Sequence, residues 1–498
     1  MSTKLKVDES LLPDVRNEIK KEYQHFINNK WWCSRSGKCF DVINPATEEI
    51  LTKVAEGDKE DVDMAVMAAR KAFDEGPWHD FTARERGRIL HSIAVLLDKD
   101  KEKFAQLESL DNGKPISETS NVDLLLAVEC FEYYAGLADQ IQGETIPVSG
   151  EFLNYTLREP VVVVGQIIPW NFPLLMLAWK LGPALATGCT VVLKPAEQTP
   201  LTALRFAELL LRTHIPAGVV NIVTGYGPTA GAAIAEHKDI DKVAFTGSTE
   251  VGRLVMEMAA KSNLKEVSLE LGGKAPNIVF ADADIDAAVQ GAITGIFFNQ
   301  GEVCCAGSRL YVEESIKNKF LNKFKAKADE IVVGDPLDPK TQMGAQVSLE
   351  QFHNILSYID EAKEEGALLI TGGTTVKEKG YFIKPTIFDC DDEDCTIAKE
   401  EVFGPVVAVF SFKDEKDLIN RANDTLYGLS AGIWTRDIGK AHRLAKEIKA
   451  GTIWINCYNQ FDAASPFGGM KQSGFGRELG QHALELYTQV KSVWVALD

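Results

Sequence analysis

Residues 161–280 alternate short β-branched runs with longer amphipathic stretches, and this alternation restricts the possible folds most strongly. It predicts strands at Val161–Val164, Thr190–Leu193, Val219–Val223, Lys242–Phe245 and Val267–Leu271. A helix is expected at Leu201–Leu211, with Thr199 as its N-cap and Pro200 as its first residue. Strands joined by helices of this length form βαβ units. The fold class is therefore α/β, with a parallel sheet that binds ligands at its carboxyl edge.

A second alternating region runs from Asn277 to about Trp434 and predicts another α/β domain. Its expected strands lie near Arg309–Val312, Val406–Phe410 and Ile453–Asn456. Two further segments, Gly143–Arg158 and Thr488–Asp498, are strand-like but belong to neither alternation, so we expect an extended arm whose pairing the pattern leaves open. With 498 residues, the chain is longer than one hydrophobic core usually organises, and two or three domains are expected.

Charge and cysteine content restrict the partners and the compartment. A net charge of -19 argues against nucleic acid and anionic membranes, because both are bound largely through Lys and Arg. Met1–Glu22 has no apolar core of a signal peptide, and no run of about 18 apolar residues predicts a membrane helix. Nine cysteines, an odd number scattered along the chain, indicate reduced thiols and a cytoplasmic protein.

Two segments at the ends of predicted strands carry groups that suit a nucleotide. Phe245–Gly252 combines a strand end, a glycine turn and a helix start, whose free N–H groups suit a pyrophosphate. The usual G-x-G-x-x-G is absent, and a plain strand-to-helix turn is equally compatible. Lys194 and Glu197 follow another strand and could bind ribose hydroxyls, or could be a solvated ion pair on a loop.

Three more segments carry groups suited to acyl chemistry. Glu270 ends a predicted strand before two glycines and is a candidate general base, although surface glutamates are commoner. Cys304 lies in a glycine-flanked loop whose N–H groups could lower a thiol pKa and bind an oxyanion, yet Cys304 and Cys305 could also be two small buried residues. Asn171 lies between Pro169 and Pro173, in a rigid segment that can present its amide.

Together with Glu400–Pro405, these motifs resemble the aldehyde dehydrogenase superfamily. The resemblance extends from Asn44–Thr47 to Ser465–Gly469 and Ser473–Glu478, and the order and separation of Glu-Leu-Gly-Gly-Lys and the cysteine loop are highly specific. It implies NAD as the cofactor and a homotetramer or homodimer. It also implies three structural parts. A Rossmann-like dinucleotide-binding domain is expected at residues 9–141 and 161–272, and an α/β catalytic domain at residues 273–487. A small β oligomerisation arm is expected at residues 142–160 and 488–498.

The resemblance also implies residue roles. Cys304 matches the nucleophile, Glu270 the general base and Asn171 the oxyanion donor, and Glu478 matches a second acid. No metal is implied, and the eight histidines show no H-E-x-x-H spacing. The implied NAD contacts are Ile168, Trp170, Lys194, Glu197, Gly227, Gly247, Ser248, Gly252, Leu271, Gln351, Glu401 and Phe403. The implied aldehyde contacts are Phe172, Trp179, Phe298, Cys305, Phe461 and Phe467. Val303 departs from the family pattern, since many relatives have cysteine there.

Apolar tunnel positions favour aliphatic, aromatic or isoprenoid aldehydes such as retinal over charged ones, as in the general and retinal-oxidising branch. A betaine-aldehyde-type dehydrogenase is the alternative, and the tunnel aromatics have no acidic residue grouped with them. An inactive structural relative and a cysteine thioester hydrolase are two further interpretations. The joint presence of Cys304, Glu270, Asn171 and Glu401 disfavours the inactive relative. Dependence of turnover on added NAD would separate the hydrolase from a dehydrogenase.

Overall fold

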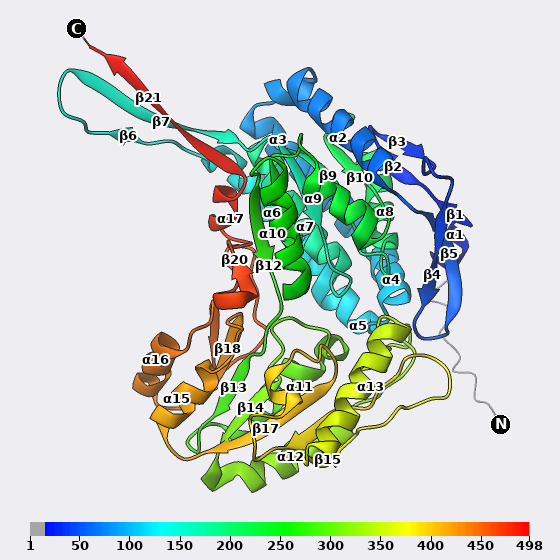
Figure 1. Ribbon diagram of the computed structural model, residues 1–498, viewed down its shortest axis with the longest axis vertical. Helices are drawn as coiled ribbons and strands as arrows, with labels where there is room; N and C mark the ends of the chain where they lie inside the picture. Colours follow the sequence, from blue (N-terminus) through cyan, green and yellow to red (C-terminus); the bar gives the residue numbers. More distant parts are fainter. Residues whose placement is uncertain (1–14, 498) are drawn as a thin grey trace.

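The computed structural model describes residues 15–497 and has an α/β fold built on two large sheets (Figure 1). The first sheet contains β2 His25–Ile27, β3 Lys30–Trp32, β8 Val163–Ile167, β9 Thr190–Lys194, β10 Val220–Ile222, β11 Lys242–Thr246, β12 Glu266–Glu270 and β20 Gly474–Phe475. Its strand order is β20-β12-β11-β8-β9-β10-β2-β3. Residues 9–14 and Asp498 of the expected domains, and residues 1–14 of the N-terminal segment, lie outside the described residues.

The five strands predicted for this sheet form its parallel centre, within three residues of the expected bounds. Its edges depart from the all-parallel expectation, because β2 runs antiparallel to β10 and β20 runs antiparallel to β12. The expected helix is α8, Leu201–Leu210, but the predicted cap is wrong by one residue. Pro200 is the N-cap, and the first free amide, that of Leu201, donates to Asp111 Oδ2 at 2.8 Å.

Helices cover both faces of the first sheet, and the alternation along each strand explains how. In β9, Val192 packs with one set of helices, while Val191 and Leu193 pack with the other, because successive side chains point to opposite faces. The helices on the Val192 face are α2 Lys59–Asp74, α9 Ala232–Glu236 and α10 Thr249–Ser262. The other face is covered by α3 Ala83–Lys99, α6 Leu124–Leu137, α7 Pro173–Thr187 and α8.

The second sheet is formed by β13 Pro276–Val279, β14 Arg309–Glu313, β15 Leu368–Thr371, β16 Thr386–Asp389, β17 Val406–Phe412, β18 Ser430–Trp434 and β19 Thr452–Ile455. Its order is β15-β16-β17-β14-β13-β18-β19, with β15 as an antiparallel edge. One face packs on α13 Leu349–Glu364, α15 Glu415–Asn423 and α16 Ile438–Glu447. The other packs on α11 Ile285–Phe297 and α12 Lys317–Asp329, in a hydrophobic core that is continuous with that of the first sheet.

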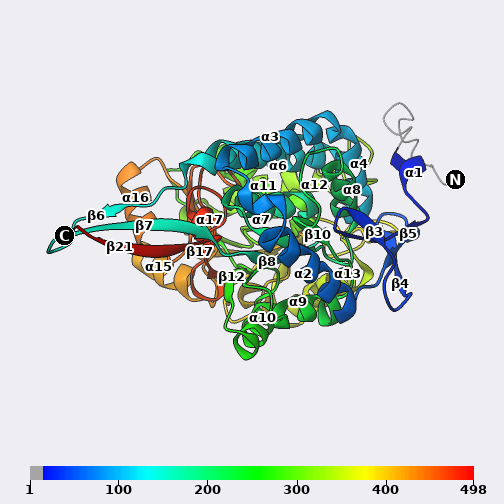
Figure 2. The same cartoon turned by 90° about the horizontal axis from the view of Figure 1, so that it is seen from above.

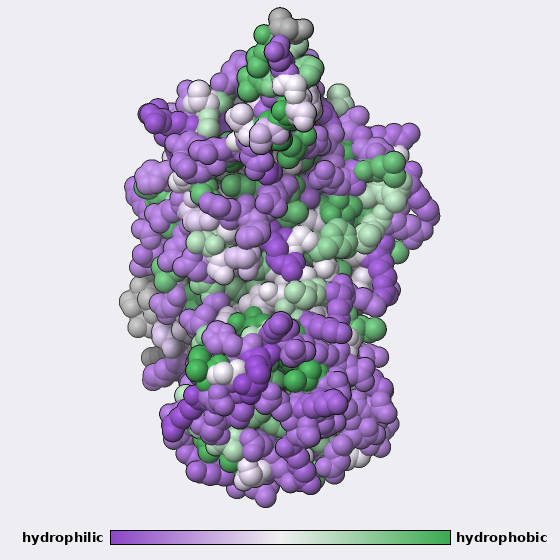
Figure 3. Space-filling view, turned by 90° about the vertical axis from the view of Figure 1, so that its left-hand side faces the viewer, coloured by the Kyte–Doolittle hydropathy of each residue, from purple (hydrophilic) through white to green (hydrophobic). Residues whose placement is uncertain are grey.

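A two-stranded ribbon with a short third strand projects from this body (Figures 1 and 2). It consists of β6 Thr145–Ile146, β7 Phe152–Pro160 and β21 Thr488–Ala496, in the order β21-β7-β6. The pairing that the sequence left open is therefore between the two orphan segments, with Thr488 opposite Pro160. Figure 3 shows apolar patches on this projecting arm, where Phe152 and Trp494 are exposed.

A small sheet with order β1-β5-β4 lies at the other end of the molecule from the arm (Figure 2). Its strands are β1 Glu22–Tyr23, β4 Cys39–Asn44 and β5 Glu49–Ala55. Within residues 15–497, no helix has the length and apolar character needed to cross a membrane.

Candidate active site

A cavity of about 530 Å³ lies where the first sheet meets the second. The parallel strands β8, β11 and β12 end at the same edge, and the residues that follow them, among them Asn171, Ser248 and Leu271, line the cavity. The opposite wall contains Cys304, from the loop between α11 and β14. A ligand in this cavity therefore meets groups from both sheets, as expected for the carboxyl edge of a parallel sheet.

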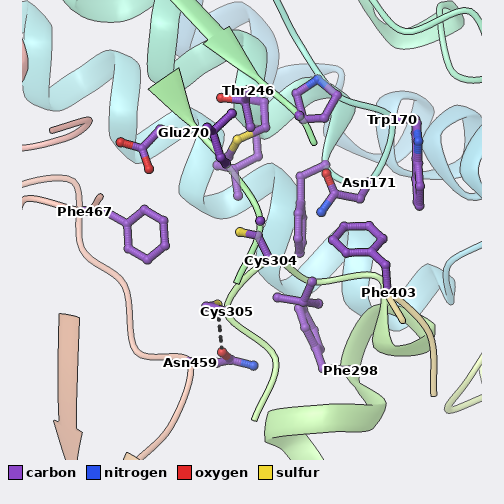
Figure 4. A pocket seen from close by; sticks show the side chains of 18 of the residues that line it. Trp170, Asn171, Thr246, Glu270, Phe298, Cys304, Cys305, Phe403, Asn459 and Phe467 are labelled. Atoms are coloured by element: carbon purple, nitrogen blue, oxygen red, sulfur yellow. Dashed lines mark hydrogen bonds between the residues drawn. The ribbon is translucent and has the colours of Figure 1, made fainter. Parts of the chain in front are cut away.

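The Cys304 loop is held by close backbone contacts and by hydrogen bonds to its carbonyl groups. A Cβ atom on Gly273 would lie only 2.4 Å from the Cys304 carbonyl oxygen, so the close approach of the two segments requires glycine. The Cys305 carbonyl accepts hydrogen bonds from Tyr458 Oη at 2.9 Å and Ser430 Oγ at 3.3 Å. Cys304 is half-buried and Cys305 is buried, with its thiol on Asn459 (Figure 4).

Glu270 and Cys304 both have perturbed acidities. Burial and the nearby Glu478 carboxylate raise the pKa of Glu270, which makes its carboxylate a stronger base than an exposed one. Neither carboxylate oxygen of Glu270 has a hydrogen-bond partner among residues 15–497. Contact with the Cys305 thiol, together with burial, raises the pKa of Cys304. The Cys305 backbone N–H acts in the expected opposite direction but is outweighed, so the lowered thiol pKa expected from the sequence is not found. In Figure 4, Cys304 lies between Glu270 on one side and Asn171 on the other.

A buried ion pair lies near Glu270. Lys180 Nζ contacts Glu478 Oε1, and the Lys180 charge opposes the rise in the pKa of Glu270. The sequence motifs indicated Glu478 but not Lys180. The signal was available, because Lys180 is the only charged residue in α7, a helix whose 15 residues are all buried. A buried lysine needs a buried partner.

The Asn171 amide is fixed by the same loop that carries Cys304. Asn171 Nδ2 donates to the Glu302 carbonyl oxygen at 2.8 Å, and the Asn171 carbonyl accepts from Asn299 Nδ2 at 2.9 Å. Asn112 Nδ2 donates a hydrogen bond to the carbonyl oxygen of Trp170, the residue before Asn171, at 2.8 Å. Residues 15–497 supply no acceptor for the second hydrogen of the Asn171 amide, so this hydrogen is available to a ligand.

Polar groups and aromatic rings line the other end of the cavity. Trp170 and Phe403 meet edge to face, with ring centroids 5.1 Å apart. Gln351 Nε2 donates to the Phe403 carbonyl at 2.7 Å, and Glu401 Oε1 accepts from the Gly273 amide at 2.8 Å. Burial raises the pKa of Glu401 to about 7. This end also contains Gly247, Ser248 and Leu271, which were expected there, and Thr246, which was not.

Five of the expected cofactor residues do not line this cavity: Ile168, Lys194, Glu197, Gly227 and Gly252. They lie further along the same sheet edge. Lys194 Nζ donates to Glu197 Oε2 at 3.1 Å, and the Ile168 amide donates to the Lys194 carbonyl at 3.1 Å. A Cβ on Gly252 would come within 2.7 Å of the Leu271 side chain, whereas one on Gly227 would meet nothing within 4 Å.

The remaining wall is aromatic. The ring centroids of Trp179 and Phe467 are 5.6 Å apart, and those of Phe461 and Phe467 are 5.4 Å apart. Phe172 stacks with Phe298 at a centroid distance of 6.2 Å. Leu126, Leu175 and Met176 also line the cavity, together with Val122, Thr294, Tyr458 and Asn459. The carboxylates among the lining residues are Glu270, Glu401 and Glu478, so the aromatic wall itself contains none.

The chain is similar to known proteins over nearly its whole length. The model of the aldehyde dehydrogenase family matches residues 31–493. The mitochondrial aldehyde dehydrogenase of Homo sapiens is 55% identical over 473 residues, which are 95% of this chain and 92% of the relative. An NAD+ complex of an aldehyde dehydrogenase from Bacillus cereus has a TM-score of 0.96 and 50% identity, covering 98% and 99% of the two chains. An indole-3-acetaldehyde dehydrogenase in complex with NAD+ has a TM-score of 0.95 and 45% identity, covering 97% and 98%.

Proposed function

Since the chain belongs to the aldehyde dehydrogenase family, we propose that Cys304, Glu270 and Asn171 carry out its NAD-dependent oxidation of aldehydes to carboxylic acids. One observation carries the assignment of roles. A half-buried thiol, a buried carboxylate with two unpartnered oxygens and an amide with a free hydrogen line the same cavity. Covalent catalysis on a thiol needs these three groups: a nucleophile, a base and an oxyanion donor.

In the first step, Cys304 gives its thiol proton to the Glu270 carboxylate, which releases it to solvent, and the sulfur attacks the carbonyl carbon to form a thiohemiacetal. The second hydrogen of the Asn171 amide and the backbone N–H of Cys304 donate to the developing oxyanion, and one such donor typically stabilises the transition state by about 3–4 kcal/mol. NAD, when bound, accepts the hydride that the thiohemiacetal carbon loses. The C–H bond breaks, the carbonyl re-forms, and a thioester remains on Cys304.

In the second step, Glu270 takes a proton from a water molecule, whose oxygen attacks the thioester carbon. The C–S bond then breaks, the acid leaves, and Cys304 returns as a thiolate. The raised pKa of Glu270 suits this role, because a carboxylate that binds protons more strongly is a better general base near neutral pH. The buried Lys180–Glu478 pair lies next to Glu270, and the Lys180 charge offsets part of the repulsion between the two carboxylates.

The residues along the sheet edge fit a dinucleotide. Thr246 Oγ1 is buried at the cavity and has no hydrogen-bond partner among residues 15–497. The start of α10 beside Gly247 and Ser248 suits a pyrophosphate. Glu197 and Lys194 would hold the adenosine ribose, and Gln351 and Glu401 the nicotinamide ribose. Trp170 and Phe403 would form the walls of the cleft. Ile168, Gly227, Gly252 and Leu271 would contribute backbone or apolar contacts.

The aromatic wall supports an apolar substrate, and we infer aliphatic, aromatic or isoprenoid aldehydes, retinal included. The wall has no carboxylate to pair with the quaternary ammonium of betaine aldehyde, which is the alternative substrate. The indole-3-acetaldehyde dehydrogenase among the similar structures is named for an aromatic aldehyde. Initial rates of NADH formation with propanal, benzaldehyde, retinal and betaine aldehyde would rank these classes. The highest kcat/KM for betaine aldehyde would contradict the inference.

Replacing the two neighbouring thiols separately tests the proposed mechanism. Cys304→Ala should abolish NADH formation and ester hydrolysis while NAD binding, measured by fluorescence titration, stays within a few-fold, because the thiol forms the intermediate but does not hold the cofactor. Cys305→Ala is the matched control and should retain most activity. The reverse result would assign the nucleophile to Cys305. Turnover of esters but not of aldehydes by the unaltered enzyme would indicate a thioester hydrolase, and no turnover of either would indicate an inactive relative.

We further propose that the arm joins copies of the chain into a homodimer or homotetramer. The exposed apolar side chains of β7 and β21, among them Phe152, Leu157 and Trp494, support this, because isolated apolar patches of this kind mark interfaces. Light scattering would show a monomer if the proposal is wrong. The nine unpaired cysteines support a reducing compartment, and we infer the cytoplasm, which localisation of a tagged chain would test.

A further inference from the structure

Asn299 joins the loop that carries Asn171 to the loop that carries Cys304. Its Nδ2 atom donates to two carbonyl oxygens, that of Asn171 at 2.9 Å and that of Glu302 at 3.1 Å. The Glu302 carbonyl also accepts from Asn171 Nδ2 at 2.8 Å. These three bonds form a closed triangle. They hold the backbone and the side chain of Asn171 against a residue only two positions before Cys304.

The triangle also determines which way the Asn171 amide faces. A carbonyl oxygen can only accept, so the group of Asn171 that contacts the Glu302 carbonyl must be the NH2 end of the amide. One hydrogen of that end is bonded to the Glu302 carbonyl, and the other remains for the oxyanion. Because Asn299 holds the same carbonyl and the Asn171 backbone, any movement of Asn299 would change the direction of that free hydrogen.

The backbone of Asn299 has a conformation that few residues tolerate. Its φ is 49° and its ψ is 42°, in the left-handed region, and Gln300 follows with φ 55°. Asparagine and glycine are the residues that adopt this region most readily. The backbone N–H of Asn299 donates to Glu118 Oε2 at 2.9 Å, so a partly buried carboxylate fixes the turn from the other side. Asn299 itself has no solvent exposure.

We propose that Asn299 is a positioning residue for aldehyde oxidation: it holds the Asn171 amide at the place where the oxyanion on Cys304 develops. This inference rests on the proposed role of Asn171 as the oxyanion donor. Asn299 would contact neither substrate nor cofactor, because Asn299 does not line the cavity. Its effect on the reaction would pass entirely through Asn171.

The first test is a double-mutant cycle on kcat/KM for one aldehyde. Asn299→Gly is the best single variant, because glycine keeps the left-handed backbone and removes only the side-chain donor. Asn171→Ala should lower kcat by about 10²- to 10³-fold. Asn299→Gly should lower kcat/KM by about 10- to 100-fold, as expected for misplacement of a reacting group. In the Asn171→Ala background, Asn299→Gly should lower kcat/KM by less than about threefold, since the two substitutions remove the same interaction.

The second test separates positioning from a general loss of structure. Alkylation of Cys304 by iodoacetamide develops no oxyanion on a carbonyl, so its rate should be unchanged in Asn299→Gly, and NAD affinity should also be unchanged. Asn29→Gly is the matched control, since Asn29 also has a left-handed backbone (φ 54°) and donates to a carbonyl, that of Ile215 at 3.3 Å. It lies far from the cavity in the β2–β3 turn and should retain full activity.

The outcomes distinguish the two proposals. If Asn171→Ala leaves kcat/KM unchanged, the proposed function of Asn171 fails. If Asn171→Ala is impaired but Asn299→Gly costs the same in both backgrounds, or slows alkylation equally, Asn299 has only a structural role and the inference is overturned. If the glycine variant does not fold, Asn299→Ala takes its place in the cycle, because alanine also removes the side-chain donor without the extra backbone freedom of glycine.

Discussion

Glu401→Gln should make the protein more stable and the enzyme less active, and both effects follow from the same buried carboxylate. Burial raises the pKa of Glu401 from its ordinary value of 4.5 to about 7. A carboxyl group whose pKa is raised in the folded state binds its proton more tightly there than in the unfolded chain. Glu401 therefore leaves the free energy of unfolding unchanged below pH 4.5 and lowers it progressively as the pH rises from 4.5 to 7. Above pH 7 the free energy stays lowered by a constant amount.

The size of the loss follows from the shift. Each pKa unit corresponds to about 1.4 kcal/mol, so the rise to about 7 corresponds to about 3 kcal/mol of lost stability at pH 8. This figure is a ceiling, because Glu401 is only partly buried in the cavity wall. Glutamine keeps the acceptor oxygen that the Gly273 amide uses and carries no charge. The variant should therefore recover much of the loss, but only where the carboxylate would be ionised.

The assay is the urea midpoint of unfolding between pH 5.5 and pH 8.5. The difference between Glu401→Gln and the unaltered protein should grow with pH and level off above pH 7. Glu364→Gln, which removes an exposed carboxylate at the end of α13, is the control and should show no such growth. At pH 8 the Glu401 variant should also lose about tenfold or more in kcat/KM for NAD, the usual cost of a lost charged hydrogen bond. A stability difference that is constant across the pH range would refute the reasoning.

Two other variants test the base and the cofactor site. Glu270→Gln should slow turnover by about 10²- to 10⁴-fold and let the thioester accumulate, because glutamine cannot deprotonate water. Mass spectrometry of the quenched enzyme would detect the thioester. Normal turnover without this adduct would contradict the role of Glu270 as the base. Glu197→Gln should reduce the preference for NAD over NADP by about tenfold for each 1.4 kcal/mol of repulsion removed from the 2'-phosphate. Equal use of both cofactors by the unaltered enzyme would show that Glu197 does not discriminate, and steady-state kinetics at saturating aldehyde decides this.

The sequence predicted the parallel centre of the first sheet well, because buried parallel strands are short apolar runs that local patterns detect. It did not predict the edges. β20 is only two residues long and joins β12 from about 200 positions away, a pairing that no local pattern indicates. The start of α8 was misplaced for the same reason, since its capping acceptor, Asp111, is 90 residues distant in sequence.

The candidate site was predicted where chemistry is carried by a distinctive motif, and missed where it depends on packing. Cys304, Glu270 and Asn171 each lie in a segment rich in glycine or proline, and the structure brings them to one cavity. Asn299 and Lys180 carry no such signal, because an asparagine in a turn and a lysine in a helix are common. Only the three-dimensional contacts show that one is bonded to two carbonyls and the other to Glu478.

The arm has a consequence for how the protein is made. Thr488 pairs with Pro160, so the two partner strands are separated by 328 positions (488 minus 160). At typical rates of synthesis of about 5–20 residues per second, β7 leaves the ribosome roughly 15–65 seconds before β21. During that interval β7 has an open edge, the form of backbone most ready to pair with a foreign strand. Every strand of both large sheets is synthesised before β21, so the proposed association through the completed arm can begin only after all these strands have been made.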